Sequence, residues 1–172
     1  MPTRKNTMQS ATLAQAIWIM GDMSTKDSVW HDKEVEAFAD VLTSMREQSK
    51  SKEVRDAAQY FADNGDDFSM SDEHYRMMNA KLDECKAVLE AMKPQSSARF
   101  LFWLAQVGKR VSGAKPKGWF SGGSDELGEE QMRGFGIVLM RVYPGSVMKL
   151  VLGKGELNPF LAIETWAKKN GS

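Results

Sequence analysis

Cysteine, histidine and proline are scarce in this sequence, with one, two and five residues respectively among 172. The lone Cys85 cannot form an intrachain disulfide, which fits a reducing compartment. The histidines, His31 and His74, are not spaced as an i, i+4 pair with another ligand, so a zinc site is not expected. The scarcity of proline and the abundance of methionine, at 12 residues, favour helices over strands.

Long apolar runs and enzyme motifs are also missing. No stretch approaches the roughly 18 apolar residues that a membrane-spanning helix needs. The first residues, MPTRKNTMQS, contain no apolar signal core, so we expect a cytoplasmic protein. The glycine-rich SGGS lacks the Gly-Lys-Ser/Thr ending of a phosphate loop. Because no nucleophile–base pair or cofactor motif can be identified, we do not expect an enzyme.

The chain has no net charge, but its charges are unevenly distributed. Residues 1–90 contain 11 Lys/Arg and 17 Asp/Glu, a net of −6, whereas residues 91–172 contain 12 and 6, a net of +6. This division predicts a molecule with an acidic face and a basic face. The alternative is that ordinary solvated helix surfaces happen to segregate by charge.

Apolar residues recur at the three-to-four spacing of amphipathic helices, which predicts an all-α single domain of about seven helices. The fifth has bulky side chains on most of its faces and is expected to be central in the core. The segment 147–152 could be a helix or an extended packing segment. In chain order, helices are expected near residues 10–20, 31–47, 51–63, 72–93, 97–111, 126–142 and 159–170.

Several boundaries have recognisable signals. Gly21 is expected to end the first helix, and Asn64-Gly65 marks a turn after the third. Asn158 is expected to cap the last helix and Gly171 to follow it. The buried side of the second helix is predicted to contain Val35, Phe38, Ala39, Leu42 and Met45.

One pattern occurs twice: an apolar helix, an irregular loop that turns acidic, and a second apolar helix. The first copy covers residues 11–42 and the second covers residues 96–140. Such a repeat would place two clusters of carboxylates on one scaffold, an arrangement that can bind cations.

The order of four segments resembles the TerB-like family of tellurite-resistance proteins over roughly residues 10–143. The segments are TLAQAIWIMGDMS, HDKEVEAFADVL, SKEVRDAAQYFADNGDDF, and the apolar helix from Ala98 followed by SDELGEEQM. The family often has Asp-Gly after the first helix of each repeat, whereas this chain has Asp22-Met23 and Ser112-Gly113. Residues 1–143 are thus predicted to form a TerB-like helical domain. Residues 144–172 would form a helical extension packed on it.

The resemblance implies an all-helical domain with an internal two-fold repeat and an acidic patch that interacts with divalent cations. It also implies a role in metal- and stress-response complexes at the inner face of the membrane. Other proteins of such a complex, and the inner-membrane surface itself, are the expected partners. Nucleic acid is not expected as a partner.

Two acidic clusters are candidate cation sites, because carboxylate oxygens suit hard cations such as Ca²⁺ or Mg²⁺. Asp22 lies where the first helix ends, while Asp32 and Glu34 lie where the second begins, so these three could converge. Capping and the helix dipole explain Asp32 and Glu34 equally well. The second cluster is a run of acids at the start of a later helix, formed by Asp125, Glu126, Glu129 and Glu130.

A third candidate is the long loop between the fifth and sixth helices. Lys115 and Lys117 precede Trp119 and Phe120, and basic residues beside aromatic ones can bind a membrane surface, a phosphate-bearing ligand or nucleic acid. We expect this loop to bind a protein partner or a membrane surface. A plain loop with its aromatic side chains folded onto the domain would have the same composition.

The sequence therefore predicts a non-enzymatic binding or scaffold protein of a metal- or stress-response system, with divalent cations bound by the acidic loops. The alternative is a purely structural helical adaptor, which binds other proteins without metal.

Overall fold

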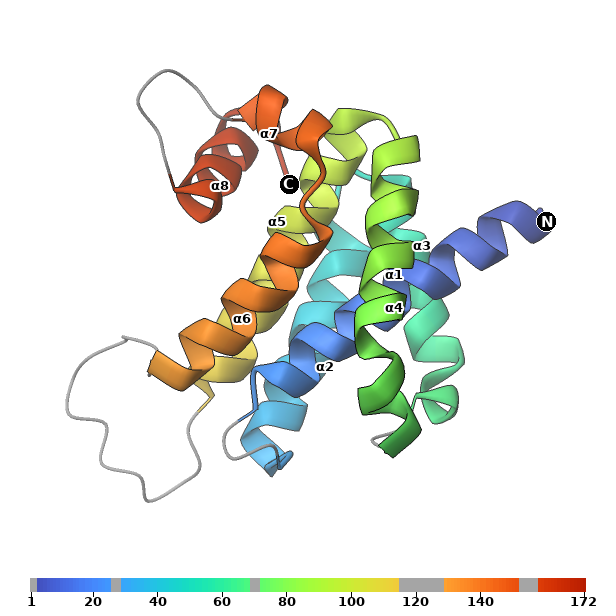
Figure 1. The fold of residues 1–172 in the computed structure, drawn as a ribbon, viewed down its shortest axis with the longest axis vertical. Coiled ribbons are helices and arrows are strands. Elements are labelled where there is room, and N and C mark those ends of the chain that lie inside the picture. Colours follow the sequence, from blue (N-terminus) through green and yellow to red (C-terminus); the bar gives the residue numbers. More distant parts are fainter. Residues whose placement is uncertain (1–2, 26–28, 69–71, 115–128, 152–157) are drawn as a thin grey trace.

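The computed structural model describes residues 3–25, 29–68, 72–114, 129–151 and 158–172, and for residues 129–135 it describes the backbone alone. Every regular element in this part of the chain is helical, which confirms the all-α prediction. The elements are α1 (Arg4–Met23), α2 (Asp32–Gln48), α3 (Lys52–Asp63), the 3₁₀ turn η2 (Gly65–Asp67), α4 (Asp72–Ala91), α5 (Pro94–Gly113), α6 (Glu129–Val142), α7 (Gly145–Val151) and α8 (Pro159–Asn170) (Figure 1).

Side-chain caps explain where several helices begin. The hydroxyl of Thr3 accepts a hydrogen bond from the Asn6 N–H, and that of Ser51 accepts one from the Val54 N–H. Asn158 caps α8 as predicted, by accepting from the N–H groups of Phe160 and Leu161. Gly171 follows α8 with φ of +90°, a conformation that favours glycine.

Two predictions about helix boundaries need correction or completion. The first helix is longer than expected, because it begins at Arg4 and continues past Gly21 to Met23. Gly21 is therefore a buried helical residue and does not end the helix. The ambiguous segment near residue 147 belongs to a short helix, α7, so the described residues contain eight α-helices where about seven were expected.

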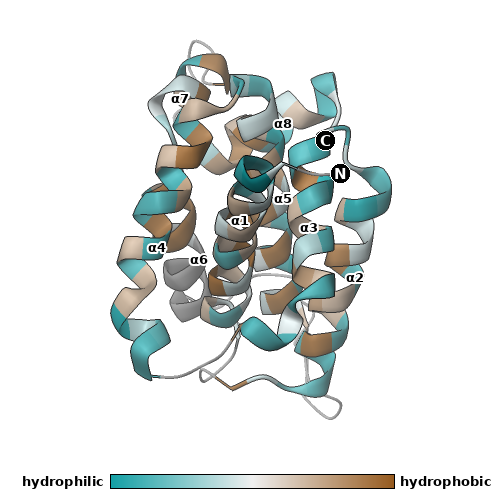
Figure 2. Ribbon diagram, turned by 90° about the vertical axis from the view of Figure 1, so that its right-hand side faces the viewer, coloured by the Kyte–Doolittle hydropathy of each residue, from teal (hydrophilic) through white to brown (hydrophobic). Residues whose placement is uncertain are grey.

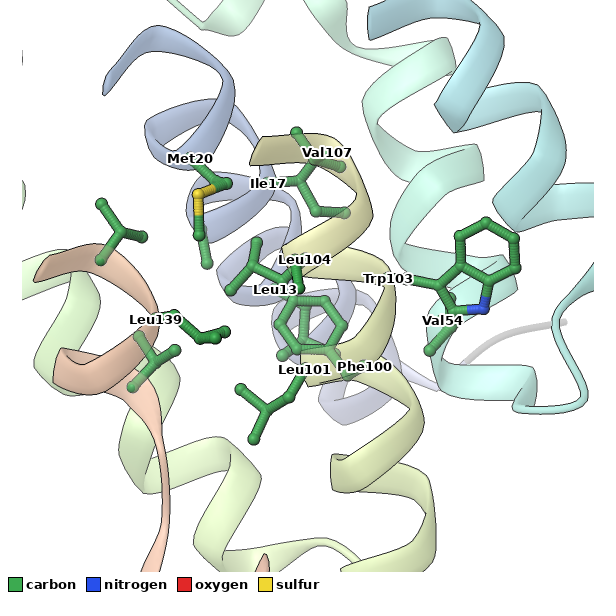
Figure 3. Packing of buried hydrophobic residues seen from close by; sticks show 14 of the residues in the cluster. Leu13, Ile17, Met20, Val54, Phe100, Leu101, Trp103, Leu104, Val107 and Leu139 are labelled. Atoms are coloured by element: carbon green, nitrogen blue, oxygen red, sulfur yellow. The ribbon is translucent and has the colours of Figure 1, made fainter. Parts of the chain in front are cut away.

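Helix α5 occupies the centre of the fold, as its apolar surface predicts. It packs against each of the other described α-helices, α1, α2, α3, α4, α6, α7 and α8. Figure 3 shows its side chains Phe100, Leu101 and Leu104 meeting Leu13 and other apolar residues of neighbouring helices. The fully buried core is mainly aliphatic. Brown apolar positions face inward and teal polar positions face outward in Figure 2.

The helices of the two predicted repeat copies pack crosswise. Helix α2 packs on α3 and α5 much more extensively than on α1, the helix that precedes it. Helix α6 packs on α1 and α4 as well as on α5. Each second helix therefore contacts the first helix of the other copy.

The buried side of α2 differs from the prediction. Phe38, Leu42 and Met45 are buried, but Val35 is 50% exposed and Ala39 is also exposed. Glu34, which is 1% exposed, and Val41 lie on the buried side in their place. Helix α2 packs against both α3 and α5. The face that these contacts bury is therefore slightly rotated from the most apolar face of the helix.

The end of the described chain is tied to the helix junctions. Helices α7 and α8 pack on α5, and the Lys50 N–H donates to the Ser172 carbonyl oxygen over 2.7 Å. The Arg99 guanidinium donates to the Asn170 and Gly171 carbonyl oxygens and lies over the Trp166 ring. Among the helices described, none is long and apolar enough to cross a membrane.

Candidate functional site

A buried polar cluster lies where α1 ends. Asp22 and His74 are each only 4% exposed, although one comes from the last turn of α1 and the other from the first turn of α4. Asp22 Oδ1 accepts a hydrogen bond of 3.2 Å from Trp30 Nε1, and Asp22 Oδ2 lies 4.0 Å from His74 Nε2. The cluster thus joins the end of α1 and the segment before α2 to the start of α4, which is distant in the sequence.

Aromatic rings separate this cluster from solvent. Trp18 stacks on Trp30 with ring centroids 5.4 Å apart, and both rings meet the edge of Phe38. Phe61 packs beside Trp18 and Phe38. Since these rings bring few polar atoms of their own, the carboxyl group of Asp22 is held in an apolar environment.

This environment shifts the pKa values of the polar groups. Burial raises the pKa of Asp22, and hydrogen bonds from Trp30 and Tyr75 together with the nearby His74 offset part of that effect. Burial also lowers the pKa of His74, an effect that Asp22 opposes and Lys81 reinforces. His74 is therefore neutral at pH 7, so its contact with Asp22 is not an ion pair at that pH.

Three serine and threonine hydroxyl groups near the end of α1 donate to backbone carbonyl oxygens. Ser24 Oγ donates to Met20 O over 2.6 Å, and Thr25 Oγ1 donates to Asp22 O over 2.7 Å. Ser112 Oγ, at the end of α5, donates to Ser24 O. These bonds satisfy the last carbonyl groups of α1, which have no partner within the helix. These hydroxyls thus act as structural caps at the end of α1.

The structure does not bring Asp22, Asp32 and Glu34 together as a cation site. Glu34 Oε1 accepts from the His31 N–H over 3.1 Å and completes a capping box, whereas Asp32 is exposed at the first position of α2. Asp22 faces Trp30 and His74 instead. In the part of the chain that the structure describes, no three His, Cys, Asp or Glu side chains are grouped so that they could hold a metal ion.

The remaining predicted site residues cannot be placed. Asp125 and Glu126 of the second acidic cluster lie outside the described residues, and Glu129 and Glu130 are described only as backbone at the start of α6. Lys115, Lys117, Trp119 and Phe120 of the predicted partner-binding loop also lie outside them.

His74 and Trp30 were not predicted as members of the cluster. Trp18 precedes Asp22 by one helical turn, so a shared helix face could have indicated an aromatic neighbour for the carboxylate. Nothing local connects His74 to Asp22, because their contact depends on the packing of α4 against α1.

We expect the free energy of unfolding to decrease as the pH falls from about 7 to about 5, and His74 to cause part of that decrease. Because its pKa in the folded state is below the ordinary value of 6.5, the unfolded chain binds the proton first. Each unit of that lowering costs about 1.4 kcal/mol once the pH is below both values. Asp22 has the opposite sign, since its raised pKa makes the folded state lose stability as the pH rises from 3.8.

Urea denaturation at a series of pH values would measure this dependence in the wild-type protein and in His74→Gln, which cannot bind the proton. The variant should have a flatter profile between about pH 7 and about pH 5. An identical slope in the two proteins would show that His74 does not contribute.

Comparisons with known proteins give no identification. No protein-family model matches the sequence, and no curated protein or solved structure is significantly similar to it. The TerB-like resemblance therefore stays a prediction.

Proposed function

We propose that this chain is a non-enzymatic helical adaptor that binds other proteins without needing a metal ion. One observation carries the proposal. Helices α4 and α6 pack side by side and together expose large apolar side chains: Tyr75 (41%), Met77 (46%), Ile137 (59%) and Met140 (43%). We call these four residues the α4–α6 face. Apolar side chains gathered on adjacent helices are typical of protein-binding surfaces.

The two helices of this face are held together at the surface. Arg141 Nε of α6 donates to Asp83 Oδ1 of α4 over 2.7 Å, and a second guanidinium nitrogen donates to Oδ2 over 3.0 Å. This two-pronged contact fixes the relative position of the helices more firmly than a single ion pair would. A surface that is already ordered loses less entropy when a partner binds.

The buried Asp22 cluster favours an adaptor over an enzyme or a cation-binding protein. Its carboxyl group is enclosed by indole and phenyl rings, and the neighbouring hydroxyls serve as caps. Of the other two candidate acids in the first repeat copy, Glu34 closes a capping box and Asp32 is exposed. Helix α2 packs on α5 and α6 packs on α1. The internal repeat and the TerB-like stress-response role stay predictions.

Photo-crosslinking in cells would test the adaptor function. A photoreactive amino acid at Ile137 or Met140 should give discrete heavier adducts, whereas one at Val35, which is similarly exposed on α2, should give none. Adduct yield should be the same in lysates treated with a chelator and in lysates supplied with Ca²⁺ or Mg²⁺. Equal labelling from Ile137 and Val35 would contradict the proposal, and adducts that require a cation would favour the metal-binding alternative.

A further inference from the structure

Two joined cavities lie along the outer side of α1. Their volumes are about 220 and about 150 Å³, and they share the lining residues Gln15, Asp67, Phe68 and Lys81. Because four residues are common to both, the cavities form one continuous depression. We call it the α1–α4 groove and define it by these four shared residues.

The groove follows from the way α3 and α4 pack. Both helices pack extensively on α1, but neither is a principal neighbour of the other. In Figure 2, α1 lies between α4 and α3. The surface of α1 left between them consists of small or polar residues, namely Ala11, Thr12 and Gln15, which leave the space unfilled.

The walls of the groove are acidic. Asp67, Glu73 and Glu84 line it and are exposed, whereas Lys81 is the basic residue among the lining side chains. His74 also lines it and is neutral at pH 7. The lining therefore has a net negative charge at neutral pH, and a cationic group entering the groove would be attracted to it.

Apolar side chains lie between these acids. Phe68 packs against Phe61 with ring centroids 4.5 Å apart and the ring planes tilted by 33°, which holds its ring in the wall of the groove. Tyr60 and the exposed Met77 line the same space. Carboxylates beside an aromatic ring and a thioether match the side chain of lysine or arginine, which has an apolar stem and a charged head.

We propose that the α1–α4 groove binds a lysine- or arginine-bearing segment of a partner protein. The inference rests on the proposed adaptor function, because Met77 belongs both to the groove lining and to the α4–α6 face. A partner that covers Met77 also contacts the lining of the groove. Charge complementarity selects a basic segment, and cavities of this size accommodate individual side chains.

Fluorescence anisotropy would test the groove with a labelled eight-residue peptide of alternating lysine and alanine. The groove variant Asp67→Asn/Glu73→Gln/Glu84→Gln removes three exposed acids. The control variant Asp40→Asn/Glu36→Gln/Glu47→Gln removes three exposed acids from α2 and has the same net charge. We expect the groove variant to bind the peptide about tenfold more weakly and the control to stay within about twofold of wild type. Raising the salt concentration should weaken binding to the wild type.

Three results would overturn the proposal. Equal weakening in both variants would mean that the peptide responds only to overall charge. Free spermidine that competes as tightly as the peptide would identify a small amine as the occupant. Self-association of the wild type that disappears in the groove variant would identify a second copy of this chain.

The adaptor function and the groove can fail separately. If adducts formed at Ile137 but the groove variant bound the peptide as tightly as the wild type, the adaptor function would be supported and the groove would not be the binding site. If the peptide bound selectively in the groove but no adduct formed at Ile137, the α4–α6 face would not be the docking surface. It would then also not explain how a partner is positioned over the groove. Circular dichroism of both triple variants checks that they remain folded.

Discussion

Replacing Phe100 by alanine is expected to lower the free energy of unfolding by about 3–5 kcal/mol. Phe100 is fully buried on α5 and is among the largest side chains in the core. Since α5 contacts all seven other described α-helices, the space left by the ring is bordered by several elements that cannot all move inward together. Urea denaturation of the two proteins measures the difference directly.

Phe102→Ala provides a matched control, because it removes the same ring from the same helix at a half-buried position. Its effect should be clearly smaller, since less of the ring leaves water on folding. Equal losses for the two variants would contradict the central position of Phe100.

The second large effect is expected at Gly21, where alanine should destabilise the fold by about 1–3 kcal/mol despite its higher helix propensity. A Cβ at this position would lie 2.7 Å from Phe38 Cε2 and 3.0 Å from Trp30 Cη2. Both rings would have to move, and Trp30 is the hydrogen-bond donor to Asp22. The variant should therefore also have altered tryptophan fluorescence in its folded state.

Gly113→Ala tests whether the loss at Gly21 comes from this close approach. Gly113 ends α5, and a Cβ there would meet no atom of the described residues within 4 Å. The control should be neutral or stabilising by up to about 1 kcal/mol. If Gly21→Ala were equally harmless, the rings would not be as closely packed against α1 as the structure has them.

The spacing of apolar residues predicted the buried face of a helix well where the most apolar face is also the one that neighbouring helices cover. Helix α5 is apolar on most sides, so its central position did not depend on knowing its neighbours. Helix α2 is different, because Val35 looks like a core residue while Glu34 looks like a surface residue. Glu34 is buried because it closes the capping box at His31, and the sequence pattern alone does not rank that contact above the burial of valine.

The candidate site was predictable only in part. Asp22 was identified as a notable carboxylate, but the first helix was expected to end at Gly21, which would have turned Asp22 toward a loop. The helix continues to Met23, so Asp22 faces inward, and its partner His74 comes from α4. A glycine can mark the end of a helix or a position where another element packs very closely. At Gly21 the close position of the Phe38 ring shows that the second explanation applies.

The crosswise packing of the helices has a consequence for how the chain is made. The side of α2 that will face α5 has no partner until residues up to Gly113 have been synthesised, about 65 residues after α2 is complete. At roughly 5–20 residues per second this interval lasts about 3–13 s. During that time the apolar stripe on this side of α2 is exposed on the nascent chain. A product truncated before α5 would keep that stripe exposed and would be a target for chaperones and for aggregation.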